Sequence, residues 1–146
     1  MPRPRRPRRE GLLLGFLVAS SIWLWLAVVD ALAGQPFRTF VVLGGIASFT
    51  LLHYALCLAY GLAAVAVVHG AAREPSLLLG ASFFFFILEF GFVMLTVILS
   101  HTGLGQLAWV RILGGNLVGA AVTLVVLWRR HPLRREMLEA EAEEAE

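Results

Sequence analysis

The chain has 146 residues, of which 59% are hydrophobic and 15% charged, whereas a soluble domain is about 45–50% apolar and about 25% charged. A chain this apolar has too little polar surface to cover itself in water, so its composition excludes an ordinary soluble domain. The formal net charge is +2, and almost all of the charged groups lie at the two ends and in short gaps between apolar runs, as in a protein of membrane spans and loops.

The N-terminal segment, residues 1–10, carries five arginines interrupted by prolines. We interpret it as a basic cytoplasmic arm and expect no nucleic acid as a partner, because nucleic-acid binding would need a basic folded surface. The apolar run that follows, residues 11–34, ends in an A-x-A site at Ala31 and Ala33, which is also typical of a cleaved signal peptide. The run exceeds the roughly 7–15 residues of a signal peptide's apolar region, so we favour an uncleaved first span.

Three further apolar runs follow, at residues 40–69, 76–100 and 108–128. Each exceeds the roughly 18 residues needed to cross a hydrocarbon core. None shows the alternation of a strand, so each is predicted to be a helix. Glycines and prolines in short loops separate the runs. Residues 11–130 are therefore predicted to form an all-α integral membrane domain, an up-down-up-down bundle of four transmembrane helices.

The arginines predict the orientation of this bundle. Only Arg38 and Arg111 lie on one side of the predicted membrane, and the other arginines lie at the two chain ends and in the second loop. The positive-inside rule therefore places both termini in the cytoplasm. We expect a multi-pass protein of a bacterial-type inner membrane, with the lipid bilayer as its first partner.

The second span carries a polar face and the only cysteine of the chain. Thr50, His53, Cys57 and Tyr60 follow one another at helical spacing. One cysteine cannot form an intramolecular disulfide, which excludes thiol redox chemistry that needs a pair within this chain. His53 is the only histidine near mid-depth, so we predict no haem within one chain, although a haem shared between chains stays open. No cofactor and no metal site are predicted.

A polar layer near the membrane midplane is the main candidate site. At a rise of 1.5 Å per residue, Glu89, His53 and Asn116 lie about 20–24 Å from the cytoplasmic ends of their spans. The supporting residues share these helical faces or lie slightly below the layer: Ser20, Ser21, Thr50, Cys57, Tyr60, Ser82 and Thr96. The fourth span also carries a G-x-x-x-G pair, Gly115 and Gly119, that would let a neighbouring helix approach closely.

Two charged residues are expected to pair at the outer end of the bundle. Asp30 ends the first span and Arg111 begins the fourth. We interpret the pair as a closure of the bundle, because charged side chains at helix ends reach the interface at low cost. The alternative is that the pair guards the outer mouth of a pathway through Glu89.

The C-terminal segment, residues 131–146, changes from basic to acidic and ends in a run of glutamates. Such a run is typical of a solvated cytoplasmic tail. Docking of a partner protein is the alternative interpretation.

Two functions remain open at this point. A carboxylate at the bilayer centre costs at least about 2.5–3.5 kcal/mol and often marks a pathway, so the leading hypothesis is movement of protons or a small cationic solute, by a homo-oligomer. The alternative is a non-catalytic accessory or scaffold subunit of a membrane complex, whose polar layer only fixes helix packing. No enzyme motif is present, and catalysis is not expected.

Overall fold

The computed structural model describes residues 7–71, 74 and 76–130. Its elements are α1 (Pro7–Leu32), α2 (Arg38–Val42), α3 (Ile46–Ala71), α4 (Ser76–Thr102), a 3-10 turn η1 (Gly105–Leu107), a π-helical segment η2 (Trp109–Leu113) and α5 (Gly114–Arg130). Residues 1–6 of the basic arm, Arg73 of the second loop and the acidic tail 131–146 lie outside the described residues.

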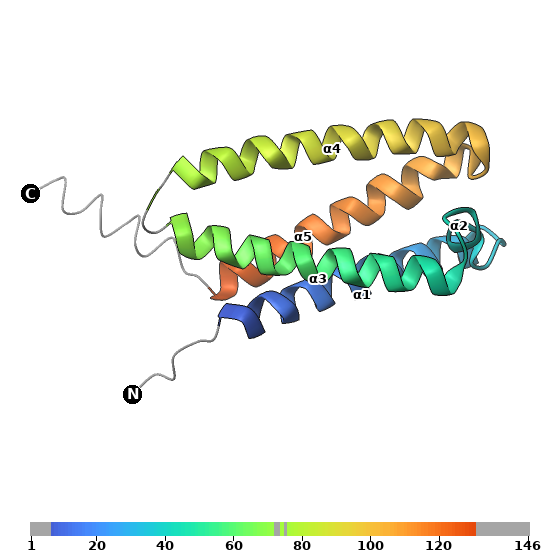
Figure 1. The fold of residues 1–146 in the computed structure, drawn as a ribbon. Coiled ribbons are helices and arrows are strands. Elements are labelled where there is room, and N and C mark those ends of the chain that lie inside the picture. The colour runs from blue at the N-terminus through green and yellow to red at the C-terminus, as the bar shows by residue number, and fades with distance from the viewer. Residues whose placement is uncertain (1–6, 72–73, 75, 131–146) are drawn as a thin grey trace, which may run out of the picture.

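Within the described residues, four helices are long and apolar enough to cross a membrane: Pro7–Leu32, Ile46–Ala71, Leu79–His101 and Gly105–Arg130. The prediction of four long apolar helices is therefore confirmed. Figure 1 shows that α1 begins and α5 ends at the same end of the molecule, where α3 also gives way to α4. We call this the terminal end, and the opposite end, which holds α2, η1 and η2, the loop end.

The predicted second span, residues 40–69, is wrong at its start. Phe40 belongs to the short helix α2, and the chain reverses at Gly44 and Gly45, which have φ of 107° and 98°. Residues that carry a side chain rarely adopt a positive φ, so the two adjacent glycines permit the reversal. The length of an apolar run reports only that its residues are hydrophobic. It gives no sign that the chain changes direction within the run.

Helix α1 packs against both α3 and α5 because small and aliphatic residues recur on one of its faces. Gly11, Leu14, Gly15, Val18 and Ala19 are all buried, at the spacing of an amphipathic stripe. Leu14 and Val18 pack against α3 and α5 in one apolar cluster. The α1 backbone also touches α3 directly, because a Cβ atom on Gly15 would collide with the carbonyl group of residue 57.

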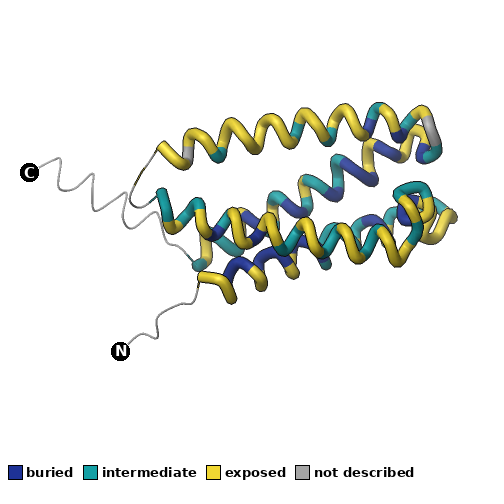
Figure 2. The backbone as a smooth tube through the Cα atoms, viewed as in Figure 1, coloured by how far each residue is buried: buried dark blue, intermediate teal, exposed yellow. Residues whose placement is uncertain are grey.

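Helix α4 is bound to the rest of the molecule mainly at the loop end. A cluster of buried residues joins it there to the following segments: Leu99, Leu104, Ala108 and Ile112. From residue 76 to residue 95, none of the described side chains is buried. Figure 2 shows this contrast, because most of α4 is coloured as exposed whereas buried residues recur along α1 and α5.

Candidate functional site

Three groups of described polar side chains connect different parts of the molecule. One is a buried cluster at the loop end, the second lies between α1 and α3, and the third joins α4 to α5. Each group is formed by residues from different helices, so each fixes the position of one helix relative to another.

The loop-end cluster is built on Asp30, in the last turn of α1. One carboxylate oxygen accepts a hydrogen bond from the Thr39 backbone N–H and the other accepts one from the Thr39 hydroxyl, both at 2.7 Å. Thr39 is the second residue of α2. Asp30 therefore holds the start of α2 against the end of α1.

Arg111 completes the cluster from the other side. Its Nε lies 2.7 Å from Asp30 Oδ1, an ion pair that lacks the angle of a directed hydrogen bond. Its Nη1 donates to the Leu104 carbonyl at 3.2 Å and its Nη2 to Gln35 Oε1 at 3.1 Å. Asp30, Thr39 and Arg111 are each 0% exposed. One arginine thus ties residues 30–35 to residues 104–111, two regions that are far apart in sequence.

The backbone around Arg111 is π-helical, and Arg111 is the middle residue of η2. Single π turns inside α-helices change the direction of the side chains and are frequent at functional sites. Here the Trp25 indole N–H donates to the Val110 carbonyl at 3.1 Å. The π segment is therefore fastened to α1 at its backbone as well as through Arg111.

Glu89 and Asn116 form the contact between α4 and α5. Asn116 Nδ2 lies 2.6 Å from each carboxylate oxygen of Glu89, so one amide group donates to both. Both side chains are half-buried. Two members of the predicted polar layer are thus brought together.

His53, the third member of the predicted layer, contacts α1 instead. Its Nε2 lies 3.1 Å from the Ala19 carbonyl oxygen, and its ring stacks on Phe49 at 5.1 Å between centroids. Cys57 Sγ lies 3.9 Å from the ring nitrogens. In the described part of the chain, no hydrogen bond joins His53 to Glu89 or Asn116. The rise per residue predicts how deep each residue lies in the membrane. It does not predict the direction in which the side chain points, and His53 points toward α1.

The supporting residues on α1 and α3 are also paired across helices. Ser20 Oγ lies 2.9 Å from the Tyr54 hydroxyl, and the Trp23 indole N–H donates to Thr50 Oγ1 at 3.0 Å. Ser21 instead donates to the Leu17 carbonyl of its own helix at 2.8 Å. The sequence did not single out Tyr54, although it lies four residues after Thr50 and therefore near the same face of the helix.

Two further predicted residues make different kinds of contact. Tyr60 donates to Thr123 Oγ1 at 3.3 Å and so links α3 to α5. Thr96 is fully buried but donates to the Phe92 carbonyl of its own helix at 2.7 Å. Ser82, predicted on the same stripe of α4, is exposed.

The predicted glycine pair of the fourth span faces α1. A Cβ atom on Gly119 would lie 2.7 Å from Ile22 Cδ1, and one on Gly115 would lie at an ordinary 3.4 Å from Ile22 Cγ2. Gly119 is therefore the tighter position. The closest approach in the molecule lies elsewhere, at Gly11, Gly15 and Gly61 between α1 and α3. The spacing of Gly11 and Gly15 is itself a G-x-x-x-G signal that could have been read from the sequence.

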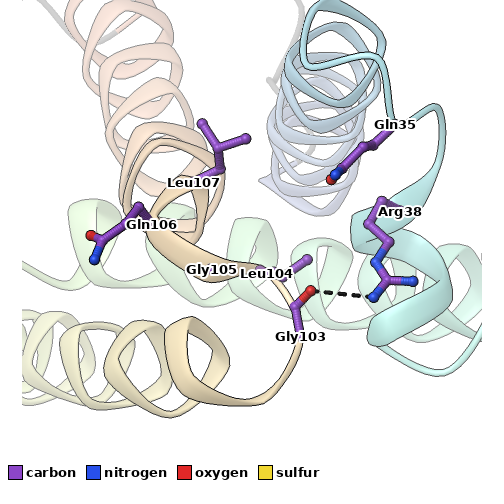
Figure 3. Close-up of a pocket in the computed structure, with 7 residues that line it drawn as sticks. All are labelled: Gln35, Arg38, Gly103, Leu104, Gly105, Gln106 and Leu107. Atoms are coloured by element: carbon purple, nitrogen blue, oxygen red, sulfur yellow. Dashed lines mark hydrogen bonds between the residues drawn. The ribbon is translucent and has the colours of Figure 1, made fainter.

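A pocket of about 510 Å³ opens at the loop end, beside the buried cluster. Figure 3 shows its lining residues: Gln35, Arg38, Gly103, Leu104, Gly105, Gln106 and Leu107. Arg38 Nη2 lies 3.5 Å from the Gly103 carbonyl oxygen and is the cationic group of the pocket. The sequence placed Arg38 in a loop but gave no sign that it lines a cavity, because the other wall comes from residues 103–107.

By length and composition, the four apolar helices are those of a multi-pass membrane protein. Comparisons with protein-family models, with curated proteins and with solved structures give no match for this chain. Within residues 7–71, 74 and 76–130, no three His, Cys, Asp or Glu side chains lie close enough together to hold a metal ion. Further assignment therefore depends on the geometry.

Proposed function

We propose that this protein is a non-catalytic subunit of a membrane assembly, and that α4 is the helix that contacts its partner. The observation that carries the proposal is the exposed surface of α4. Leu79, Phe83, Phe86 and Phe90 are 76%, 68%, 70% and 68% exposed. Their spacing of four, three and four residues places them on one face, the pattern of a helix that packs along another helix.

The polar side chains support a packing role. Glu89 with Asn116, Ser20 with Tyr54, and Trp23 with Thr50 each join two helices. Interhelical hydrogen bonds in a membrane average about 0.6 kcal/mol, so several of them fix helix positions without making the molecule rigid. This arrangement is that of a scaffold.

The proposed setting is a bacterial-type inner membrane with the terminal end in the cytoplasm. The arginine distribution supports it, because only Arg38 and Arg111 belong to the loop end. The bilayer and either a second copy of the chain or another membrane subunit are then the partners.

Site-specific photo-crosslinking in membranes tests the role of α4. A photoreactive amino acid replaces Phe83, Phe86 or Phe90 in cells that also express a second copy with a different tag. The matched control is Leu124, which is equally apolar and 64% exposed but lies on α5. We expect one discrete adduct from the α4 positions and none from position 124. An adduct with both tags identifies a homo-oligomer, and an adduct of another size identifies a different subunit. If none of the three α4 positions gave a crosslinked adduct, the proposal would be contradicted.

A second candidate function is movement of protons or a small cationic solute through Glu89. The observation that favours it is a half-buried carboxylate in the middle of a candidate span, held by one carboxamide. Proteoliposome flux across a pH series separates the two functions. If the protein is a scaffold, the wild type gives no flux. Flux that is lost in Glu89→Gln and kept in His53→Ala would instead identify the protein as a transporter.

A further inference from the structure

We propose that the loop-end pocket binds a phosphate-bearing anion through Arg38. The phosphate group could belong to a lipid headgroup at the membrane surface or to a free phosphate ion, since both present the same charged oxygens to the site. The pocket and its charge are independent of the role proposed for α4.

The two arginines of the loop end are in different electrostatic situations. Arg111 is fully buried and its charge is balanced by Asp30 at 2.7 Å. Arg38 is exposed, and its contact in the described part of the chain is the neutral Gly103 carbonyl at the long distance of 3.5 Å. A guanidinium has five N–H donors in a planar fork that matches phosphate oxygens. Arg38 therefore gives the pocket a positive charge with most of its donors unused.

Gln35 adds a second donor because of its contact with the buried cluster. Its Oε1 accepts from Arg111 Nη2 at 3.1 Å. A guanidinium can only donate, so this contact fixes the orientation of the Gln35 amide. Gln35 is one of the residues that line the pocket, and its NH₂ group is the end of the amide that this contact leaves for another partner. A wall with a guanidinium and an amide NH₂ group selects an anion and disfavours a cation.

The surroundings of the pocket match the level of lipid headgroups. Exposed apolar side chains lie close to it along the chain, namely Phe37, Val41, Leu107 and Trp109. Tryptophan is enriched at the boundary between hydrocarbon and water, which is the level at which lipid headgroups lie. The volume of about 510 Å³ is sufficient for a phosphate with its glycerol attached.

Binding to the full chain in a neutral detergent tests the proposal with two probes. Native mass spectrometry measures retention of phosphatidylglycerol, and isothermal calorimetry measures binding of inorganic phosphate. The variant Arg38→Gln removes the pocket charge, and Arg129→Gln removes an exposed arginine at the opposite end as the control. Because a charge-assisted hydrogen bond contributes about 1.5–3 kcal/mol, we expect Arg38→Gln to bind at least about tenfold more weakly. Arg129→Gln should bind as the wild type does.

The outcomes distinguish the source of the phosphate group. Lipid retention that depends on Arg38, without calorimetric binding of phosphate, assigns the site to a headgroup. Phosphate binding that depends on Arg38 and displaces the lipid assigns it to a free anion as well. Equal effects of both substitutions, or no effect of Arg38→Gln on either probe, would overturn the proposal. Arg38→Lys keeps the charge and should retain part of the binding, which separates loss of the site from loss of the fold.

Discussion

The buried ion pair shows how single residues hold the loop end together. Asp30 accepts two hydrogen bonds from Thr39 and pairs with Arg111, and the three residues are excluded from solvent. Taking charges out of water is costly, and mutual attraction offsets this cost only when both partners are present. The pair therefore matters most when it is broken on one side.

We expect Arg111→Met to destabilise the protein by about 3–5 kcal/mol, because it leaves the Asp30 carboxylate buried without its cation. The double variant Asp30→Leu with Arg111→Met should recover much of this loss, since apolar replacement of a whole buried pair is often neutral. Thermal unfolding of the detergent-solubilised chain measures both effects. The exposed arginine variant Arg129→Met is the control. If Arg111→Met and Arg129→Met unfold at the same temperature, the ion pair does not stabilise the loop end.

At the scale of elements, α1 and α3 approach each other at the level of their backbones. Gly61 of α3 faces Gly11 and Gly15 of α1, and a Cβ atom on Gly61 would collide with the α1 backbone. Backbone atoms of two packed helices cannot move aside as the end of a side chain can. Helix association in lipid depends on such close approach, because lipid tails compete equally for apolar side chains.

Gly61→Ala should therefore separate α1 from α3 and destabilise the protein by about 1–3 kcal/mol, the usual cost of overpacking. Gly80→Ala is the matched control, because nothing lies within 4 Å of a Cβ atom at Gly80 on α4. There the added methyl should be neutral or stabilising by up to about 1 kcal/mol, through helix propensity. Unfolding in a denaturing detergent gives both values. Equal stability of the two variants would mean that the close contact contributes nothing.

At the scale of the whole molecule, the helices alternate in direction, so a bilayer crossed by all four would have the loop end on one side and the terminal end on the other. Which end faces the cytoplasm is a prediction from the arginines. The single cysteine makes this testable, because Cys57→Ser removes the only native thiol.

Two single-cysteine variants are made in the Cys57→Ser background. Gln106→Cys lies at the loop end and Glu74→Cys at the terminal end, and both replaced residues are exposed. We expect a membrane-impermeant thiol reagent to label position 106 in intact cells and position 74 only after permeabilisation. The reverse pattern would place the termini outside and contradict the positive-inside argument. Total labelling in detergent provides the control for expression.

The candidate site was predictable in part. The sequence pointed to Asp30 and Arg111 because both stand at span ends on the same side, and to Glu89 and Asn116 because both lie at similar depth. Thr39, Gln35 and Tyr54 were not foreseen as partners, since a single polar residue shows no pattern that identifies which side chain it will contact. The pocket beside Arg38 could not be predicted from the sequence either, because its walls come from two distant segments, residues 35–38 and 103–107.

The sequence by itself determined that the chain has four long apolar helices of alternating direction, because hydropathy and run length report which segments can leave water. Only the tertiary structure decided that His53 contacts α1 while Glu89 contacts α5, that α3 begins after a glycine reversal, and that α4 is largely exposed. The physical reason is that burial in lipid fixes how deep a residue lies. The rotation of each helix and its choice of neighbour depend on close packing and on hydrogen bonds between specific side chains.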